Sequence, residues 1–121
     1  MTYDPLCEVV DAPLNIDESV IEQLRLFRYA PKLQSLPGLN VDYERKRLSG
    51  ILDHLIDRLL DGVARNPTKL WVLTQFQVSL ELVEDEDTEG RDHFGLEIEQ
   101  VMEILDIDSS DGLLACYLGG I

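Results

Sequence analysis

Hydrophobic residues recur along the chain at the spacing of helix faces, and proline, glycine and polar clusters separate the segments. Because residues three and four positions apart share one face of a helix, such spacing predicts amphipathic helices. The clearest example covers residues 40–64, which Asn40 can cap. Its apolar side consists of Leu48, Ile51, Leu52, Leu55, Ile56, Leu59, Leu60 and Val63.

An earlier helix is predicted to start near Asp17 and to end before Pro31, because the residue before a proline avoids the helical conformation. Ile16 and Ile21 have the spacing of a hydrophobic staple at its start. Residues 1–15 contain two prolines and are expected to be irregular. The apolar stripe of this first helix is Val20, Ile21, Leu24 and Phe27.

Two more helices are predicted near the C-terminus. A fourth helix over 88–105 buries Phe94, Ile98, Val101, Met102 and Leu105. A short last helix, capped by Asp108 or Ser109 and stopped by Gly119, carries Leu113, Leu114, Tyr117 and Leu118.

Residues 67–82 allow two interpretations. Asn66 as cap and Pro67 at the first helical position favour a helix, with Val72, Phe76, Leu80 and Val83 on one face. Residues 75–82 alternate polar and apolar strictly, which is typical of a strand. The other plausible strand is 6–10, and an isolated two-stranded ribbon is only marginally stable, so we predict a helix. The expected fold is therefore an all-α, single-domain bundle of four to five helices over residues 1–121.

Negative charge is concentrated in one part of the chain. The net charge is −14, and residues 81–111 hold 13 of the 24 carboxylates but a single cation, Arg91. Such a field repels nucleic acid and anionic lipid and attracts basic proteins. The chain has no apolar run long enough to cross a bilayer, and its N-terminus lacks the pattern of a signal peptide. We therefore expect a cytoplasmic protein with a basic protein partner, and neither a nucleic-acid nor a membrane partner.

The stretch "DEDTEGRDHFGLE" at 85–97 resembles the start of a calcium loop. An EF-hand loop counted from Asp85 needs a bidentate carboxylate at its twelfth position, which is Leu96, and an aliphatic residue at its eighth, which is Asp92. Because both requirements fail, we predict that Asp87 or Thr88 caps a helix here, and we expect no metal site.

Catalytic motifs are absent from the sequence: it has no GxxxxGK[ST], GxGxxG or GxSxG. Helical geometry places His54 on a polar side, in solvent, and His93 is either an ordinary residue of a helix start or a pH-sensitive contact. Cys7 and Cys116 are expected to be reduced and packed. These residues predict no enzymatic activity and no cofactor.

The ending "VMEILDIDSSDGLLACYLGGI" resembles the C-terminal signature of a small bacterial family of uncharacterised all-helical domains. The resemblance implies a helical fold and a bacterial origin, and it carries no catalytic residue. A looser similarity, in size and charge, is to small acidic immunity proteins, which neutralise toxic enzymes by covering a basic active site.

The function expected from the sequence is binding of a basic protein through one helix face. Its carboxylates steer the partner and Leu96 supplies an apolar anchor, so that the protein acts as an immunity or antitoxin module. One alternative is a nucleic-acid mimic that blocks a DNA- or RNA-binding protein, and another is a small enzyme or ligand-binding protein with a pocket invisible in the sequence. The predicted partner-binding residues are Asp92, Leu96, Glu99, Glu103 and Asp106.

Overall fold

The computed structural model describes residues 3–37 and 41–119, and these ranges contain helices and no strand. The prediction of an all-α fold is confirmed, including the helical choice for residues 75–82. The elements are a 3-10 helix η1 (Pro5–Glu8) and the helices α1 (Glu18–Tyr29), α2 (Val41–Gly62), α3 (Lys69–Leu82), α4 (Thr88–Ile104) and α5 (Leu113–Leu118).

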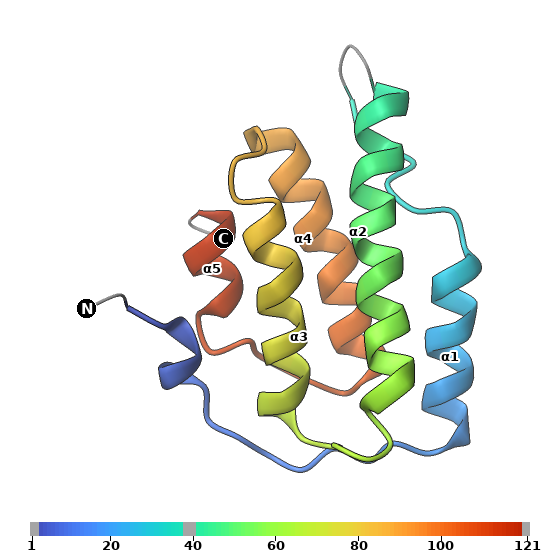
Figure 1. Cartoon of the computed structure of the whole chain (residues 1–121), viewed down its shortest axis with the longest axis vertical. Helices are drawn as coiled ribbons and strands as arrows, with labels where there is room; N and C mark the ends of the chain where they lie inside the picture. The colour runs from blue at the N-terminus through green and yellow to red at the C-terminus, as the bar shows by residue number, and fades with distance from the viewer. Residues whose placement is uncertain (1–2, 38–40, 120–121) are drawn as a thin grey trace.

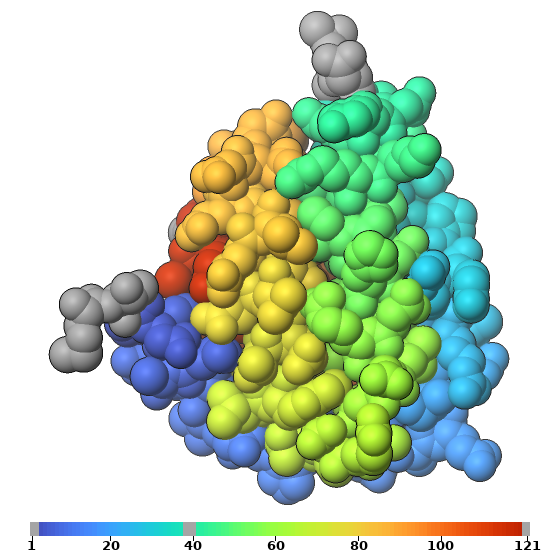
Figure 2. Space-filling model, in the orientation of Figure 1, coloured from blue at the N-terminus to red at the C-terminus, as the bar shows by residue number. Residues whose placement is uncertain are grey.

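The five α-helices close a ring around the core. In this ring α1 contacts α2, α2 contacts α3, α3 contacts α5, α5 contacts α4, and α4 returns to α1 (Figure 1). A further contact between α2 and α4 crosses the middle. The short helix η1 lies outside the ring and packs on α3 and α5, and Figure 2 shows this N-terminal segment against them at one edge of the molecule.

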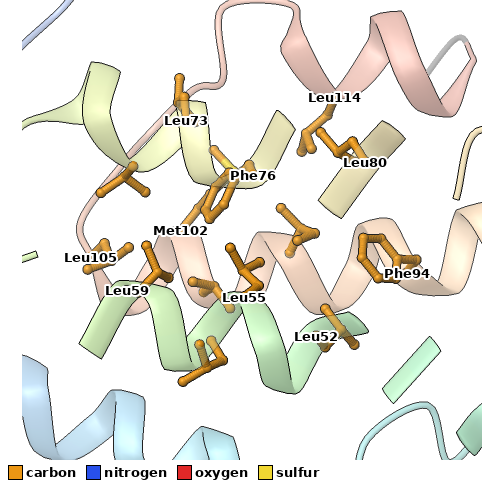
Figure 3. Close-up of a cluster of buried hydrophobic side chains, with 14 of the residues drawn as sticks. Leu52, Leu55, Leu59, Leu73, Phe76, Leu80, Phe94, Met102, Leu105 and Leu114 are labelled. Carbon is orange, nitrogen blue, oxygen red and sulfur yellow. The ribbon is translucent and has the colours of Figure 1, made fainter. Parts of the chain in front are cut away.

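The apolar stripes predicted from the sequence meet inside the ring. Leu52, Leu55 and Leu59 of α2 face side chains of α3, α4 and α5, and all three leucines are fully buried (Figure 3). Truncating a buried leucine to alanine generally costs about 2–5 kcal/mol, so these contacts dominate the stability of the fold.

The strand-like alternation in α3 has a tertiary cause. Three elements, α2, α5 and η1, contact this helix, so its polar side chains face protein on several sides. Arg58 of α2 donates to the carbonyl oxygen of Gln75 at 2.9 Å and to Ser79 Oγ at 2.8 Å. Polar residues between the apolar ones are therefore paired with neighbouring elements, and the helix shows no single polar face.

The first helix starts directly after Asp17, as expected, and Asp87 is confirmed as a cap, whereas the predicted cap Asn66 is wrong. Asp17 accepts from the Val20 amide at 3.0 Å, and Asp87 accepts from the Gly90 amide at 2.8 Å. The cap of α3 is Thr68, while Asn66 Nδ2 donates to the Gly62 carbonyl at the end of α2. The reason is a tertiary contact: Pro13 forms an isolated β-bridge with Thr68, which keeps Thr68 extended so that α3 starts at Lys69. The predicted cap Asn40 lies outside the described residues.

The two ends of the chain also differ from the prediction. The N-cap of α5 is Gly112, without a side-chain bond, in place of Asp108 or Ser109, while Gly119 ends the helix as predicted. Residues 1–15 were expected to be irregular, but they include η1, which Asp4 caps by accepting from the Leu6 amide at 3.0 Å. Pro5 of η1 is buried, so packing against α3 and α5 stabilises this turn.

Candidate functional site

A groove of about 590 Å³ lies between α4, α5 and the loop that joins them; we call it the acidic groove. Five carboxylates line it, and the residues lining it include no lysine, arginine or histidine. The carboxylates are Asp92, Glu99, Glu103, Asp106 and Asp108, and the apolar lining residues are Leu96, Met102, Ile107, Leu114, Ala115 and Leu118.

All five residues predicted from the sequence line this groove. Asp92, Leu96, Glu99 and Glu103 follow one another on α4 at steps of four, three and four residues, which places them on one helix face. Leu96 is 56% exposed. The structure therefore brings an exposed leucine and like charges together along one wall.

The floor of the groove is the outer surface of the core. Leu118 and Met102 are 3% and 6% exposed, and Figure 3 shows Met102 and Leu114 among the core side chains. A Cβ atom at Gly95 would lie only 2.8 Å from Leu118 Cδ1, so glycine at this position lets α5 approach α4 closely. This close approach brings the apolar floor between the acidic walls.

The end of α4 turns the chain into the second wall. The Ile107 amide donates to the Met102 carbonyl at 2.8 Å, and the Asp106 amide donates to the Glu103 carbonyl at 3.2 Å. These two bonds form a Schellman motif, which requires a left-handed residue, and Asp106 has φ 59°. Asp106 was expected to continue the acidic face of the helix, but it lies in the turn beyond the last helical residue, Ile104.

The wall formed by α5 and residues 107–112 was missed from the sequence. Asp108 was considered only as a helix cap, yet it is exposed and lines the groove. The small residues Gly95 and Ala115 were the available signal, because small side chains permit close helix packing, but nothing in their spacing identifies the partner helix.

Two carboxylates within residues 81–111 stabilise the fold and do not line the groove. Glu97 Oε1 accepts from the Leu33 amide at 3.2 Å, where buried Leu33 has φ 60° in the α1–α2 loop. Asp111 Oδ2 accepts from Lys69 Nζ at 2.7 Å and from the Val10 amide at 2.9 Å. These two hydrogen bonds, the one from Lys69 first, lower the pKa of Asp111. The high density of carboxylates is thus partly structural.

The histidines and cysteines lie outside the acidic groove. His54 is exposed on α2, as predicted, and His93 is half-buried with its Nε2 3.8 Å from Glu89 Oε2. The prediction that the cysteines are packed is wrong: Cys7 and Cys116 are free and exposed, because η1 and α5 bury their other faces. Within residues 3–37 and 41–119, no three His, Cys, Asp or Glu side chains are grouped to hold a metal ion.

A second cleft, of about 420 Å³, lies where the end of α1 meets α2. It contains four cations, but carboxylates neutralise three of them, so its net field is weak. The pairs are Arg28 with Asp57 at 2.8 Å, Lys32 with Asp53 at 2.9 Å, and Arg45 with Asp42 at 3.1 Å.

No helix in the described part of the chain is long and apolar enough to cross a membrane. Comparison with curated proteins and with solved structures found no match, so no resemblance to immunity proteins is shown. The family described as "Domain of unknown function (DUF4844)" matches residues 15–121, which include α1 to α5 and every residue of the acidic groove. This chain therefore belongs to the DUF4844 family.

Proposed function

We propose that this protein is a non-enzymatic binding module whose acidic groove takes up a basic, partly apolar segment of another protein. The observation that supports the proposal is the lining of the groove: five carboxylates, six apolar side chains and no cation. A partner with lysine or arginine beside leucine-like residues complements both features.

The carboxylates attract a basic partner over a distance and fix its orientation in the groove. Like charges on both walls add to a negative potential that raises the encounter rate with basic proteins, and salt screens this effect. Each exposed charge pair contributes only about 0.2–1 kcal/mol, so the charges alone do not account for tight binding.

The apolar side chains supply the remaining affinity. Leu96 presents an exposed side chain at the rim, and the floor residues expose a few per cent of their surface each. An apolar anchor of the partner, seated between them, removes this surface from water at about 25 cal/mol per Å². A segment with cations flanking an apolar stripe, such as an amphipathic helix, offers this combination.

The arrangement favours binding over catalysis. An enzyme of the kind considered from the sequence needs a pocket that gathers a histidine or cysteine with carboxylates. The residues lining the acidic groove include neither type, and His54, Cys7 and Cys116 are exposed elsewhere. The most concrete form of the proposal is an immunity or antitoxin protein of the bacterial cytoplasm that covers the basic active site of a toxin.

The test uses a defined probe, a synthetic helical peptide with lysines on one side and leucines on the other, and measures its Kd by fluorescence anisotropy. In the groove variant, Glu99→Gln, Glu103→Gln and Asp106→Asn keep side-chain shape while removing three charges. The control variant, Glu81→Gln, Glu84→Gln and Asp85→Asn, makes the same charge change at exposed positions of the same segment that do not line the groove.

The groove variant is expected to raise the Kd about tenfold or more, from three charge pairs of about 0.5 kcal/mol each, and the control variant less than about threefold. Equal effects in both variants would mean that only net charge matters, and the proposed site would be wrong. Leu96→Ser adds a second test. It should weaken binding if Leu96 contacts an apolar side chain of the partner, and it should leave binding unchanged if the groove acts only as a mimic of nucleic-acid phosphates. Circular dichroism confirms that each variant is folded.

A further inference from the structure

The chain begins with a segment that precedes the family match and is nevertheless tied to the bundle. We call residues 3–14 the N-terminal strap. The Leu14 amide donates to the Pro67 carbonyl at 2.7 Å, and the Lys69 amide donates to the Ala12 carbonyl at 2.8 Å. Further along, Gln77 Nε2 donates to Asp4 Oδ1 at 3.1 Å. The strap is therefore attached along α3 from its N-terminus to its middle.

One carboxylate links this strap to the loop beside the acidic groove. Asp111 Oδ2 accepts from the Val10 amide of the strap at 2.9 Å and from Lys69 Nζ of α3 at 2.7 Å. Its neighbours Ser110 and Gly112 line the groove, but Asp111 does not. The side chain thus connects the wall of the groove to elements that lie far away in the sequence.

The rest of the loop between α4 and α5 is held by local bonds. The Asp111 amide donates to Ser109 Oγ, the Leu113 amide to the Ser110 carbonyl, and the Leu114 amide to Ser110 Oγ. Within the described residues, two hydrogen bonds join the loop 106–112 to parts of the chain other than α4 and α5. Asp111 accepts both of them. Both side chains of the ion pair are largely shielded, with 13% of Lys69 and 23% of Asp111 exposed, so solvent screens the pair less than a surface pair.

We propose that Asp111 is a positioning residue that couples attachment of the N-terminal strap to the shape of the acidic groove. When the bonds from Val10 and Lys69 are intact, the loop is held in place and Asp108 stays on the second wall of the groove. When the bonds break, the loop moves and the second wall loses its alignment with the first. The proposal rests on the proposed function in one respect, that the groove binds a basic segment.

Lys69→Met gives a test in which electrostatics alone predicts a lower Kd for the peptide, whereas loss of positioning predicts a higher one. Lys69 does not line the groove, and removing its positive charge makes the protein more attractive to a cationic peptide. Loss of the bond to Asp111 loosens the wall and weakens binding. We expect the Kd of the lysine–leucine peptide to rise about three- to tenfold, which corresponds to one lost charge-assisted contact.

Arg65→Met is the matched control. Arg65 is exposed, its guanidinium donates to the Asp61 carbonyl, and the variant removes the same charge without touching the loop. We expect an equal or slightly lower Kd for the peptide. Asp111→Asn provides a second test with a conserved shape and is compared with Asp85→Asn, an exposed position outside the groove.

Hydrogen exchange supplies a readout independent of the peptide. In Lys69→Met and Asp111→Asn, the amides of Val10 and of residues 107–112 should exchange at least about fivefold faster, while amides in the middle of α2 stay unchanged. Faster loop exchange with a higher Kd supports the proposal. Unchanged loop exchange, or a Lys69→Met variant that binds the peptide as tightly as Arg65→Met, overturns it. If the wild-type protein binds no peptide, the proposed function is wrong, and loop exchange alone decides whether Asp111 holds the loop.

Discussion

Replacing Asp106 with glycine is expected to stabilise the fold while it weakens binding to a basic partner. Asp106 has φ 59° at the end of α4, a conformation that costs a residue with a Cβ atom roughly 1–2 kcal/mol. Its carboxylate also lies at the negative end of the helix dipole, which costs about 0.3–1 kcal/mol. Glycine removes both costs but adds about 0.4–1 kcal/mol of conformational entropy to the unfolded chain. The net expectation is a gain of about 1 kcal/mol.

Asp108→Gly is the control for this change. Asp108 lines the same groove and is exposed, but its φ is not positive. The control therefore loses the same charge and gains the same unfolded-state entropy without relieving a left-handed residue, and it should be destabilised by about 0.4–1 kcal/mol. The two variants should differ by about 1.3–3 kcal/mol, the sum of the left-handed and dipole costs, although their chemical change is identical.

Thermal and urea unfolding, followed by circular dichroism, measure this difference. For a chain of 121 residues, about 1 kcal/mol corresponds to a shift in Tm of about 4 °C. The affinity of both variants for the lysine–leucine peptide should fall by up to about fivefold, because each loses one carboxylate of the groove. Equal stability of the two variants would refute the reasoning that Asp106 is retained at a conformational cost.

Two further predictions concern the helices and the strap. Gly62→Ala should destabilise the fold by about 1–3 kcal/mol, because the new Cβ would lie 2.6 Å from Cζ2 of the rigid Trp71 ring. Gly50→Ala, on the same helix, has nothing within 4 Å of the new Cβ and should stabilise by about 0.5–1 kcal/mol, so thermal unfolding should show opposite signs. The lowered pKa of Asp111 means that its contribution to stability is complete above the unfolded pKa of about 3.9 and is lost as the pH falls through the folded value. Urea unfolding should therefore show the deficit of Asp111→Asn shrinking from pH 6 to pH 3, and a constant deficit would contradict this.

The sequence predicted the helices and the acidic face because both depend on local spacing. Apolar residues three and four apart identify a helix face wherever they occur, and an aspartate cap acts on an amide three residues away, as Asp17 and Asp87 do. The same spacing placed Asp92, Leu96, Glu99 and Glu103 on one surface before any neighbouring helix was known. These features need no information about distant parts of the chain.

The tertiary structure decided the features that depend on which elements meet. The start of α3 moved from Pro67 to Lys69 because the N-terminal strap pairs with Thr68, and no local signal encodes that pairing. The acidic face became a groove only because α5 packs beside α4, where Gly95 gives Leu118 room. In the sequence, Glu97 and Asp111 are two more carboxylates of an acidic run. Only the tertiary structure shows that they bind the Leu33 amide and Lys69.

The physical reason is the distance in sequence over which each interaction acts. Helix periodicity and capping join residues at most four positions apart, so one segment carries the whole pattern. The bond from the Val10 amide to Asp111 joins residues 101 positions apart. Its formation depends on the packing of the whole ring of helices, which brings the strap and the α4–α5 loop to the same end of α3.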